Sequence, residues 1–233
     1  MRVTHLIVVS SLLMASAAWA DETGRIEYDR YCAWCHGPNG DGRGLGAKRF
    51  ELPPRDFTTA SFKCRTTPTG TLPTDDDLRR SIRDGLHGTG MPSWRILSGR
   101  QVENVIAFVK HFSSRWTSEP VPAPLAVPPE PPATAESVQR GADLWGRLRC
   151  ATCHGERGQG AGTAAPNLHD DAGNTMRAAD LTKKGSLRCG DGAVRIYTTF
   201  MTGLNGTPMP SFASVVKPDE AWDLVHFVQS LQR

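Results

Sequence analysis

Apolar residues recur at helical spacing near the end of each half of the chain. In the first half they follow Ser98 and Gln101, a pair typical of a capping box. In the second half they follow Pro218 and two acidic residues, a pattern typical of a first helical turn. The apolar positions are Val102, Val105, Ile106 and Val109 in the first half, and Trp222, Val225 and Val228 in the second. We therefore predict an amphipathic helix at the end of each half.

Three more helices are predicted from local patterns. Thr74 and Asp77 resemble a capping box and predict a helix over 75–85. Residues 26–35 and 135–149 each predict a helix that runs into a motif of two cysteines and a histidine. A glycine-rich loop follows each motif.

A proline-rich segment separates the two halves. Residues 117–134 hold seven prolines, the first at Pro120 and the last at Pro132. Such a composition does not hold a helix and favours an extended, semi-rigid chain. We predict that 117–134 is a linker between one domain at 21–116 and a second at 135–233.

Residues 1–20 predict a cleaved secretory signal peptide. Arg2 precedes an apolar run from Leu6 to Met14, and small residues end the segment at Ala20. The apolar run is too short for a permanent membrane span, so we expect a soluble protein in the periplasm. The formal net charge of +3 is too small to indicate nucleic-acid binding.

The strongest chemical signal is a Cys-x-x-Cys-His motif that occurs twice. It comprises Cys32, Cys35 and His36 in the first copy, and Cys150, Cys153 and His154 in the second. Cysteines three residues apart on a helix share a face, so both sulfurs can reach the two vinyl groups on one porphyrin edge. The motif is the attachment signature of c-type haem, and its histidine is the expected iron ligand. The sequence therefore predicts two covalently bound haem c groups.

Three other readings of these cysteines are a zinc site, a thioredoxin-like redox pair and a structural disulfide. Zinc usually requires two further ligands at matching spacing, and neither half offers a second such pair. A thioredoxin-like pair needs a strand and helix context, and neither motif follows an apolar β-rich run. The trailing histidine and the repetition favour haem.

An offset of 118 residues maps one motif onto the other and also maps Met91 onto Met209. Each methionine lies 55 residues after its histidine, in a Gly-Thr-x-Met-Pro-Ser loop. An internal repeat of this kind indicates two copies of one unit, each with its own cofactor. We predict that each thioether is the sixth iron ligand, which raises the reduction potential relative to two histidines. The remaining histidines His87, His111, His169 and His226 have no counterpart in the other copy, so we expect surface or packing roles for them.

Together these residues resemble the class I cytochrome c family, in the form of dihaem proteins with two such domains in tandem. The resemblance rests on CAWCHG and CATCHG, on GTGMPSW and GTPMPSF, and on the closing amphipathic helices. It implies an all-α fold in which each domain is a small helical bundle around one haem. It also implies that a proline orients each proximal histidine, and Pro54, with Pro53 equally placed, and Pro166 are the nearest matches.

Two cysteines depart from the simplest family pattern. Cys64 and Cys189 occupy equivalent places in the repeat and are not used by the haem motifs. In an oxidising compartment they could form a disulfide between the domains if these pack about a pseudo-two-fold axis. The alternative is two separate buried thiols.

A carrier of single electrons is the expected function, because irons with all six positions filled leave no place for a substrate. The expected donors are a dehydrogenase or a quinol-oxidising complex, and the expected acceptors are an oxidase or a reductase. Peripheral association with membrane complexes fits the same role. Two alternatives stay open: a thiosulfate dehydrogenase-like dihaem enzyme in which Cys64 or Cys189 ligates one iron, and a cytochrome subunit of a larger respiratory enzyme.

Overall fold

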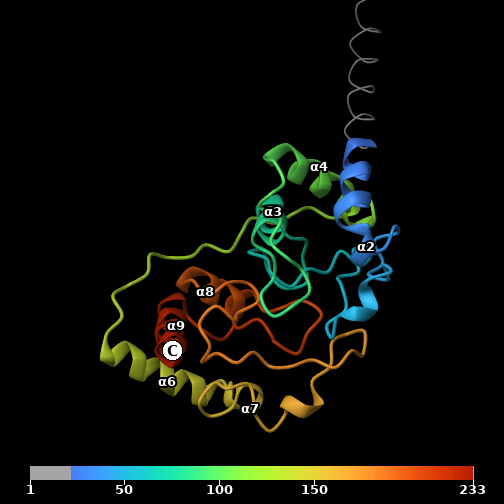
Figure 1. Cartoon of the computed structure of the whole chain (residues 1–233). Helices are drawn as coiled ribbons and strands as arrows, with labels where there is room; N and C mark the ends of the chain where they lie inside the picture. The colour runs from blue at the N-terminus through green and yellow to red at the C-terminus, as the bar shows by residue number, and fades with distance from the viewer. Residues whose placement is uncertain (1–21, 233) are drawn as a thin grey trace, which may run out of the picture. The chain divides into compact units, whose positions relative to one another are not determined.

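The structure is a computed structural model, which describes residues 22–232 (Figure 1). The predicted signal peptide at residues 1–20 lies outside this range. Over 22–232 the regular elements are helices, together with one isolated β-bridge between His169 and Thr175 and no β-strand. The expected all-α fold is confirmed.

Residues 22–31 are helical, and ten labelled elements follow them among the described residues. They are α2 (Ala33–His36), the 3₁₀ helix η1 (Ala47–Arg49), α3 (Asp75–Asp84), α4 (Gly99–Lys110), α5 (Arg115–Ser118), α6 (Ala135–Arg147), α7 (Ala151–His154), the 3₁₀ helix η2 (Ala165–Asn167), α8 (Ala193–Thr202) and α9 (Pro218–Leu231). The offset of 118 residues maps α2 onto α7, η1 onto η2 and α3 onto α8. The sequence repeat is therefore a repeat of structure as well.

Two predicted capping boxes are confirmed, whereas the helix predicted over 26–35 spans residues 22–31 and ends before the first cysteine motif. Thr74 and Asp77 form a reciprocal capping box at the start of α3, and Ser98 and Gln101 form another at the start of α4. Helix α6 ends at Arg147, two residues before the predicted end. Arg149 has a φ of 58°, a left-handed conformation that an α-helix cannot contain, so it separates α6 from the second cysteine motif.

The chain divides into two compact units that interleave along the sequence. Among the described residues, the first is formed by 22–60 together with 94–118, and the second by 61–93 together with 119–232. The segment 61–93, which belongs to the first sequence copy, is therefore part of the second unit. The predicted boundaries at 21–116, 117–134 and 135–233 follow the sequence repeat and not the compact units. They stay a prediction about the extent of the two repeat copies and of the linker.

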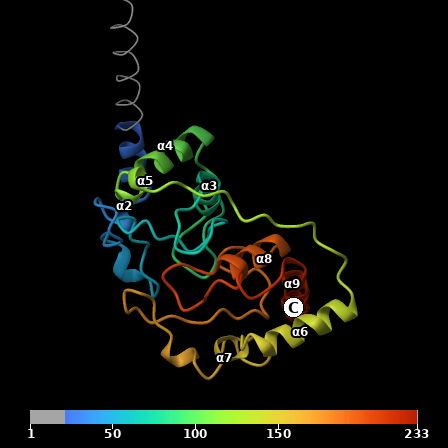
Figure 2. The same cartoon turned by 180° about the vertical axis from the view of Figure 1, so that it is seen from behind.

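One glycine in each unit allows two helices to cross closely. In the first unit, a Cβ on Gly24 would lie 2.5 Å from the carbonyl oxygen of Asn104 on α4. In the second unit, a Cβ on Gly141 of α6 would lie 2.1 Å from the carbonyl oxygen of Asp223 on α9. Helices α6 and α9 pack against each other, and α8 also packs on α9 (Figures 1 and 2). The same crossing of first and last helices thus occurs in both copies.

The proline-rich segment is extended but packed. Residues 120–134 contain no helix or strand, while Thr117 and Ser118 at the predicted start of the linker belong to α5. The backbone N–H of Leu125 donates to the carbonyl oxygen of Thr66 at 2.7 Å. Leu125 and Val127 also pack against the apolar core of the second unit. The segment therefore contributes to that unit, beyond the spacer role that its composition predicts.

None of the helices described over residues 22–232 combines the length and the apolar character that crossing a membrane requires.

Candidate haem sites

Each cysteine motif folds as a single helical turn. The backbone N–H of His36 donates to the carbonyl oxygen of Cys32 at 2.9 Å, and that of His154 donates to Cys150 at 2.9 Å. Gly37 and Gly155 follow with φ values of 78° and 79°, which end the turn in the same way in both copies. The two cysteines and the histidine of each motif are therefore held on one short helical segment, as attachment to one porphyrin edge requires.

Both motif histidines are oriented by a backbone carbonyl group. Nδ1 of His36 lies 3.0 Å from the carbonyl oxygen of Arg55, and Nδ1 of His154 lies 3.0 Å from that of Ala179. A carbonyl oxygen only accepts, so Nδ1 carries the proton in each ring and Nε2 keeps its lone pair. This is the arrangement that orients a histidine as a metal ligand. The residues present therefore fit an axial ligand to iron in both copies.

Burial keeps these rings in the state that an iron ligand needs. His36 is only 8% exposed, and its ring stacks on that of Phe57 at 4.4 Å between centroids. Burial lowers the pKa of His36 and the pKa of His154 below the ordinary value for histidine. Both imidazoles are therefore neutral at neutral pH, with Nε2 available as a donor to a metal.

The motif cysteines have the character of structural thiols. Burial raises the pKa of Cys32 to about 12 and that of Cys150 to about 11, and it also raises the pKa of Cys35. A thioredoxin-like pair needs a lowered thiol pKa, so the chemistry of these thiols does not fit that reading. None of the four motif cysteines forms a disulfide. Over residues 22–232, no three His, Cys, Asp or Glu side chains gather as a metal site, so the zinc reading finds no complete ligand set there.

The two methionine loops share the same hydrogen bonds. The N–H of Met91 donates to the hydroxyl oxygen of Thr89 at 3.1 Å, and its carbonyl oxygen accepts from the N–H of Leu86 at 3.1 Å. In the second copy, Met209 makes the same two bonds with Thr207 and Leu204, at 3.2 and 3.1 Å. The repeat therefore preserves the geometry of the loop as well as its sequence.

A glycine fixes the base of each methionine loop. Gly85 and Gly203 have φ values of 72° and 68°, in the left-handed region. A Cβ at either position would approach the backbone of the Pro-Ser pair after the methionine at 2.7 Å. The chain must therefore turn at a glycine for the loop to close on the end of its helix.

The second copy gathers its predicted site residues around one apolar core. Two of the predicted site residues, Cys150 and Met209, pack against the core cluster of the second unit, and so does Ala179, whose carbonyl oxygen accepts from His154. In the first copy, His36 belongs to the first compact unit and Met91 to the second. The pairing of His36 with Met91, and of His154 with Met209, as ligands of one iron each stays a prediction from the repeat.

The structure corrects one of the proline assignments. A Cβ on Gly42 would meet the carbonyl oxygen of Pro54 at 2.6 Å, and a Cβ on Gly160 would meet that of Ala178 at 2.7 Å. The counterpart of Pro54 is therefore Ala178. Pro166 lies in η2, which maps onto η1, so it precedes the additional residues of the second copy.

The four histidines outside the motifs were expected to have surface or packing roles. His87, His111 and His169 are exposed. His226 is 2% exposed on α9, and its Nδ1 lies 2.5 Å from the hydroxyl oxygen of Ser137. These environments fit surface and packing roles.

Cys64 and Cys189 form a disulfide within the second compact unit, with Cα atoms 5.3 Å apart. The alternative of two separate thiols is therefore wrong. The bond joins the segment 61–93 of the first copy to the second copy. It also leaves neither sulfur as a thiolate that could ligate iron.

Comparison with known proteins agrees with the geometry of both copies. Residues 138–232 match the family Cytochrome c, and residues 20–109 match the family Cytochrome C oxidase, cbb3-type, subunit III. The chain is 26% identical over 209 residues to the Cbb3-type cytochrome c oxidase subunit FixP of Azorhizobium caulinodans, covering 89% of this chain. It spans 58% of the length of that relative.

A solved structure is similar over nearly the whole chain. A chain of the Kuenenia stuttgartiensis reducing HAO-like protein complex superposes with a TM-score of 0.88 at 38% identity, covering 91% of this chain and 96% of that one. Domains of the cytochrome c type imply covalently bound haem c. The chain therefore belongs to the cytochrome c family and consists of two cytochrome c-type domains in tandem.

Proposed function

We propose that this protein is a periplasmic dihaem c-type cytochrome that carries single electrons between respiratory redox partners. Cys32 and Cys35 would hold one haem and Cys150 and Cys153 the other. His36 with Met91, and His154 with Met209, would be the axial ligands. The observation that carries the proposal is the identical orientation of the two histidines, each with Nδ1 on a backbone carbonyl oxygen and Nε2 left for iron.

Bound haem c supplies an iron that alternates between the ferrous and ferric states. The histidines stay neutral because they are buried, and the carbonyl groups of Arg55 and Ala179 fix the direction of their rings. The soft thioethers of Met91 and Met209 favour the ferrous state and so raise the reduction potential. These groups keep the same coordination in both states, so little has to rearrange when an electron passes.

The test is to produce the full chain in a host that attaches haem c and to analyse the periplasmic fraction. Intact-mass measurement should give two covalent haems on a chain that begins after Ala20, and a redox titration should give one-electron steps. A single haem, or a protein that is retained in the cytoplasm, would contradict the proposal.

A second candidate keeps the chemistry and changes the setting. One relative is a cbb3-type oxidase subunit and the other is a chain of a reducing HAO-like protein complex, which favours a cytochrome subunit of a larger respiratory enzyme. Affinity capture of the tagged full chain from native membranes distinguishes the two. A stoichiometric catalytic subunit would support the subunit role, and recovery of the free chain alone would support the mobile carrier.

The enzymatic alternative needs a thiolate on one iron. Cys64 and Cys189 are the only cysteines of the sequence outside the haem motifs, and they are bonded to each other. Electron transport is therefore the role that these residues support best.

A further inference from the structure

A short segment of the first copy contacts the base of the methionine loop in the second copy. This segment, residues 64–70, begins at the disulfide-bonded Cys64, and it lies in the same compact unit as the loop that carries Met209. The loop, residues 203–209, begins at Gly203 directly after α8. The contacts between the two segments are polar and come from both ends of 64–70.

Arg65 binds the carboxyl end of α8. Its side chain is 3% exposed, and its guanidinium donates to the carbonyl oxygens of Thr202 and Gly203 at 2.7 and 3.2 Å. The last carbonyl groups of a helix have no partner within the helix and carry partial negative charge, so a buried cation stabilises them. Burial lowers the pKa of Arg65 to about 10, so the side chain keeps its charge at neutral pH. Arg65 therefore fixes the point at which the Met209 loop leaves its helix.

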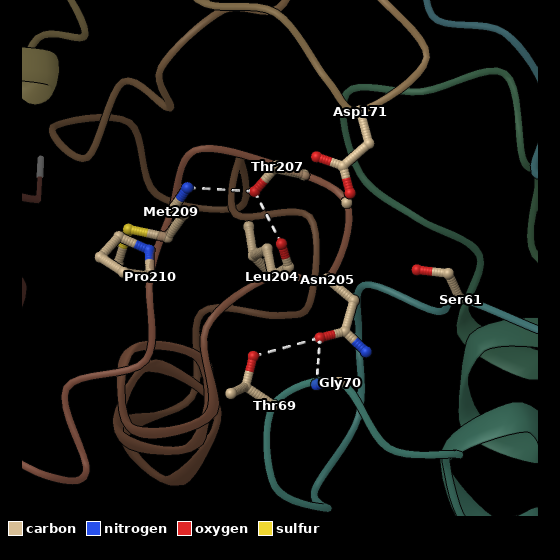
Figure 3. A pocket seen from close by; sticks show the side chains of 10 residues that line it. Ser61, Thr69, Gly70, Asp171, Leu204, Asn205, Thr207, Met209 and Pro210 are labelled. Atoms are coloured by element: carbon tan, nitrogen blue, oxygen red, sulfur yellow. Dashed lines mark hydrogen bonds between the residues drawn. The ribbon is translucent and has the colours of Figure 1, made fainter.

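Asn205 ties the loop itself to the other end of the segment. Its amide oxygen accepts from the N–H of Gly70 at 2.9 Å and from the hydroxyl of Thr69 at 3.3 Å, and both bonds are drawn in Figure 3. Asn205 is 8% exposed. It lies four residues before Met209, so residues 69 and 70 of the first copy are tied to the loop near its methionine.

A third contact comes from the residues that only the second copy has. The N–H of Asp171 donates to the carbonyl oxygen of Gly206 at 3.3 Å. Asp171, Asn205, Thr69 and Met209 all line one cavity of about 330 Å³ (Figure 3). The Met209 loop is therefore contacted from two directions, by 64–70 and by the inserted residues.

The equivalent positions of the Met91 loop have different surroundings. The offset of 118 maps Asn205 onto His87, which is exposed. Gly88 follows His87, and a Cβ on it would meet nothing within 4 Å. Two loops with the same internal hydrogen bonds thus differ at this position, which holds a buried Asn205 bonded to Gly70 in one loop and an exposed His87 in the other.

We propose that Arg65 and Asn205 are positioning residues for Met209, which hold this ligand on its iron more firmly than Met91 is held. The inference rests on the proposed His/Met ligation. A held loop keeps its methionine close to the iron after a bond breaks, so external ligands compete poorly with it. Small ligands such as imidazole should therefore enter the first haem site before the second.

The experiment follows the far-red absorption band of a methionine-ligated ferric haem during titration with imidazole. In a Met91→Ala background the band reports Met209 alone, and in a Met209→Ala background it reports Met91 alone. Imidazole should displace Met91 at a lower concentration than Met209. In the Met91→Ala background, adding Asn205→Leu should lower the imidazole concentration at which half of Met209 is displaced by about tenfold. This is the scale expected when buried donors lose their acceptor.

Two variants separate positioning from general loss of structure. Asn205→Asp keeps an acceptor oxygen and should restore most of the midpoint, whereas His87→Leu at the matched exposed position should leave the Met91 midpoint unchanged. If Asn205→Leu fails to retain its haem, Arg65→Lys provides the milder change and should lower the Met209 midpoint in the same direction. Equal midpoints for Met209 with and without these changes would overturn the proposal. A protein with no far-red band from the start would overturn the proposed ligation instead.

Discussion

Nδ1 of His154 donates a hydrogen bond to the carbonyl oxygen of Ala179 at 3.0 Å, although the two residues are separated by 25 positions. The acceptor segment is itself held by the N–H of Leu181, which donates to the carbonyl oxygen of Gly158 at 2.7 Å. The same pair of contacts occurs in the first copy. The glycine-rich loop therefore places the segment that orients His154, the proposed iron ligand.

Gly160→Ala should disturb this segment. Gly160 has a φ of 76°, and a Cβ on it would lie 2.7 Å from the carbonyl oxygen of Ala178. We expect a loss of about 1–3 kcal/mol of unfolding free energy, from backbone strain and from the displaced carbonyl segment, together with a shifted potential of the second haem. Chemical denaturation and redox titration measure the two effects.

Gly146→Ala is the matched control. Gly146 lies within α6, and a Cβ on it would meet nothing within 4 Å. The substitution should stabilise the protein by about 0.5–1 kcal/mol, because alanine favours the helix. Equal losses in both variants would show that the Ala178 contact is not the cause.

Met91→Ala should leave the first haem attached while it removes the sixth ligand. The potential of that haem should fall, and its ferrous iron should bind CO, because the methionine no longer fills the position. Met209→Ala should do the same at the second haem. Unchanged potentials and no CO binding in either variant would show that the methionines are packing residues.

Cys35→Ala should impair covalent attachment in the first copy alone. With one thioether position lost, the haem is held by Cys32 only, and the second motif is unaffected. Haem staining on a denaturing gel together with intact-mass analysis measures the outcome. Cys64→Ala is the control, since that cysteine is bonded to Cys189 and lies outside the motifs.

The Cys64–Cys189 disulfide should contribute about 2–5 kcal/mol to stability, as is typical for removal of a native bridge. The double variant Cys64→Ala, Cys189→Ala should therefore unfold at a lower denaturant concentration while it retains both haems. Non-reducing peptide mapping checks the bond itself. A wild-type protein with both thiols free would contradict the structure at this point.

Asp77 should make stability depend on pH in the acid range. Its carboxylate is buried, which raises its pKa, but the N–H groups of Thr66 and Thr74 and the guanidinium of Arg80 donate to it and leave the pKa lowered overall. A pKa that is lower in the folded state means that the contribution is present above the ordinary carboxyl pKa. It is lost as the pH falls through the folded value. Asp77→Asn should weaken this acid dependence in thermal melts, and an unchanged acid dependence in this variant would contradict the role of Asp77.

Much of the fold followed from local sequence patterns. The capping boxes at Thr74 and Ser98 and the proline at Pro218 are short-range signals, because the residues involved bond to each other within one turn. The break at Arg149 was not predicted, since an arginine has no special preference for positive φ and tertiary packing imposes it. The division into units at 61–93 was also missed, because it depends on long-range contacts.

The candidate site also has parts that local sequence patterns indicate and parts that depend on long-range contacts. The cysteines, histidines and methionines are predicted as site residues from their spacing, which a repeat makes visible. The acceptors Arg55 and Ala179 act through backbone carbonyl groups, which carry no side-chain signature, although the match between RDFT and ADLT marks their segments. The role of Arg65 depends on Thr202, 137 residues away, and no local pattern reports such a contact.

The most direct test of the central claim is a spectroscopic redox titration of the purified full chain, with the haem content quantified in the same sample. The proposal predicts two haems per chain, a far-red band from each ferric iron, and loss of both bands in one-electron steps on reduction. A single haem, or an iron without the methionine band in the oxidised wild-type protein, would contradict it.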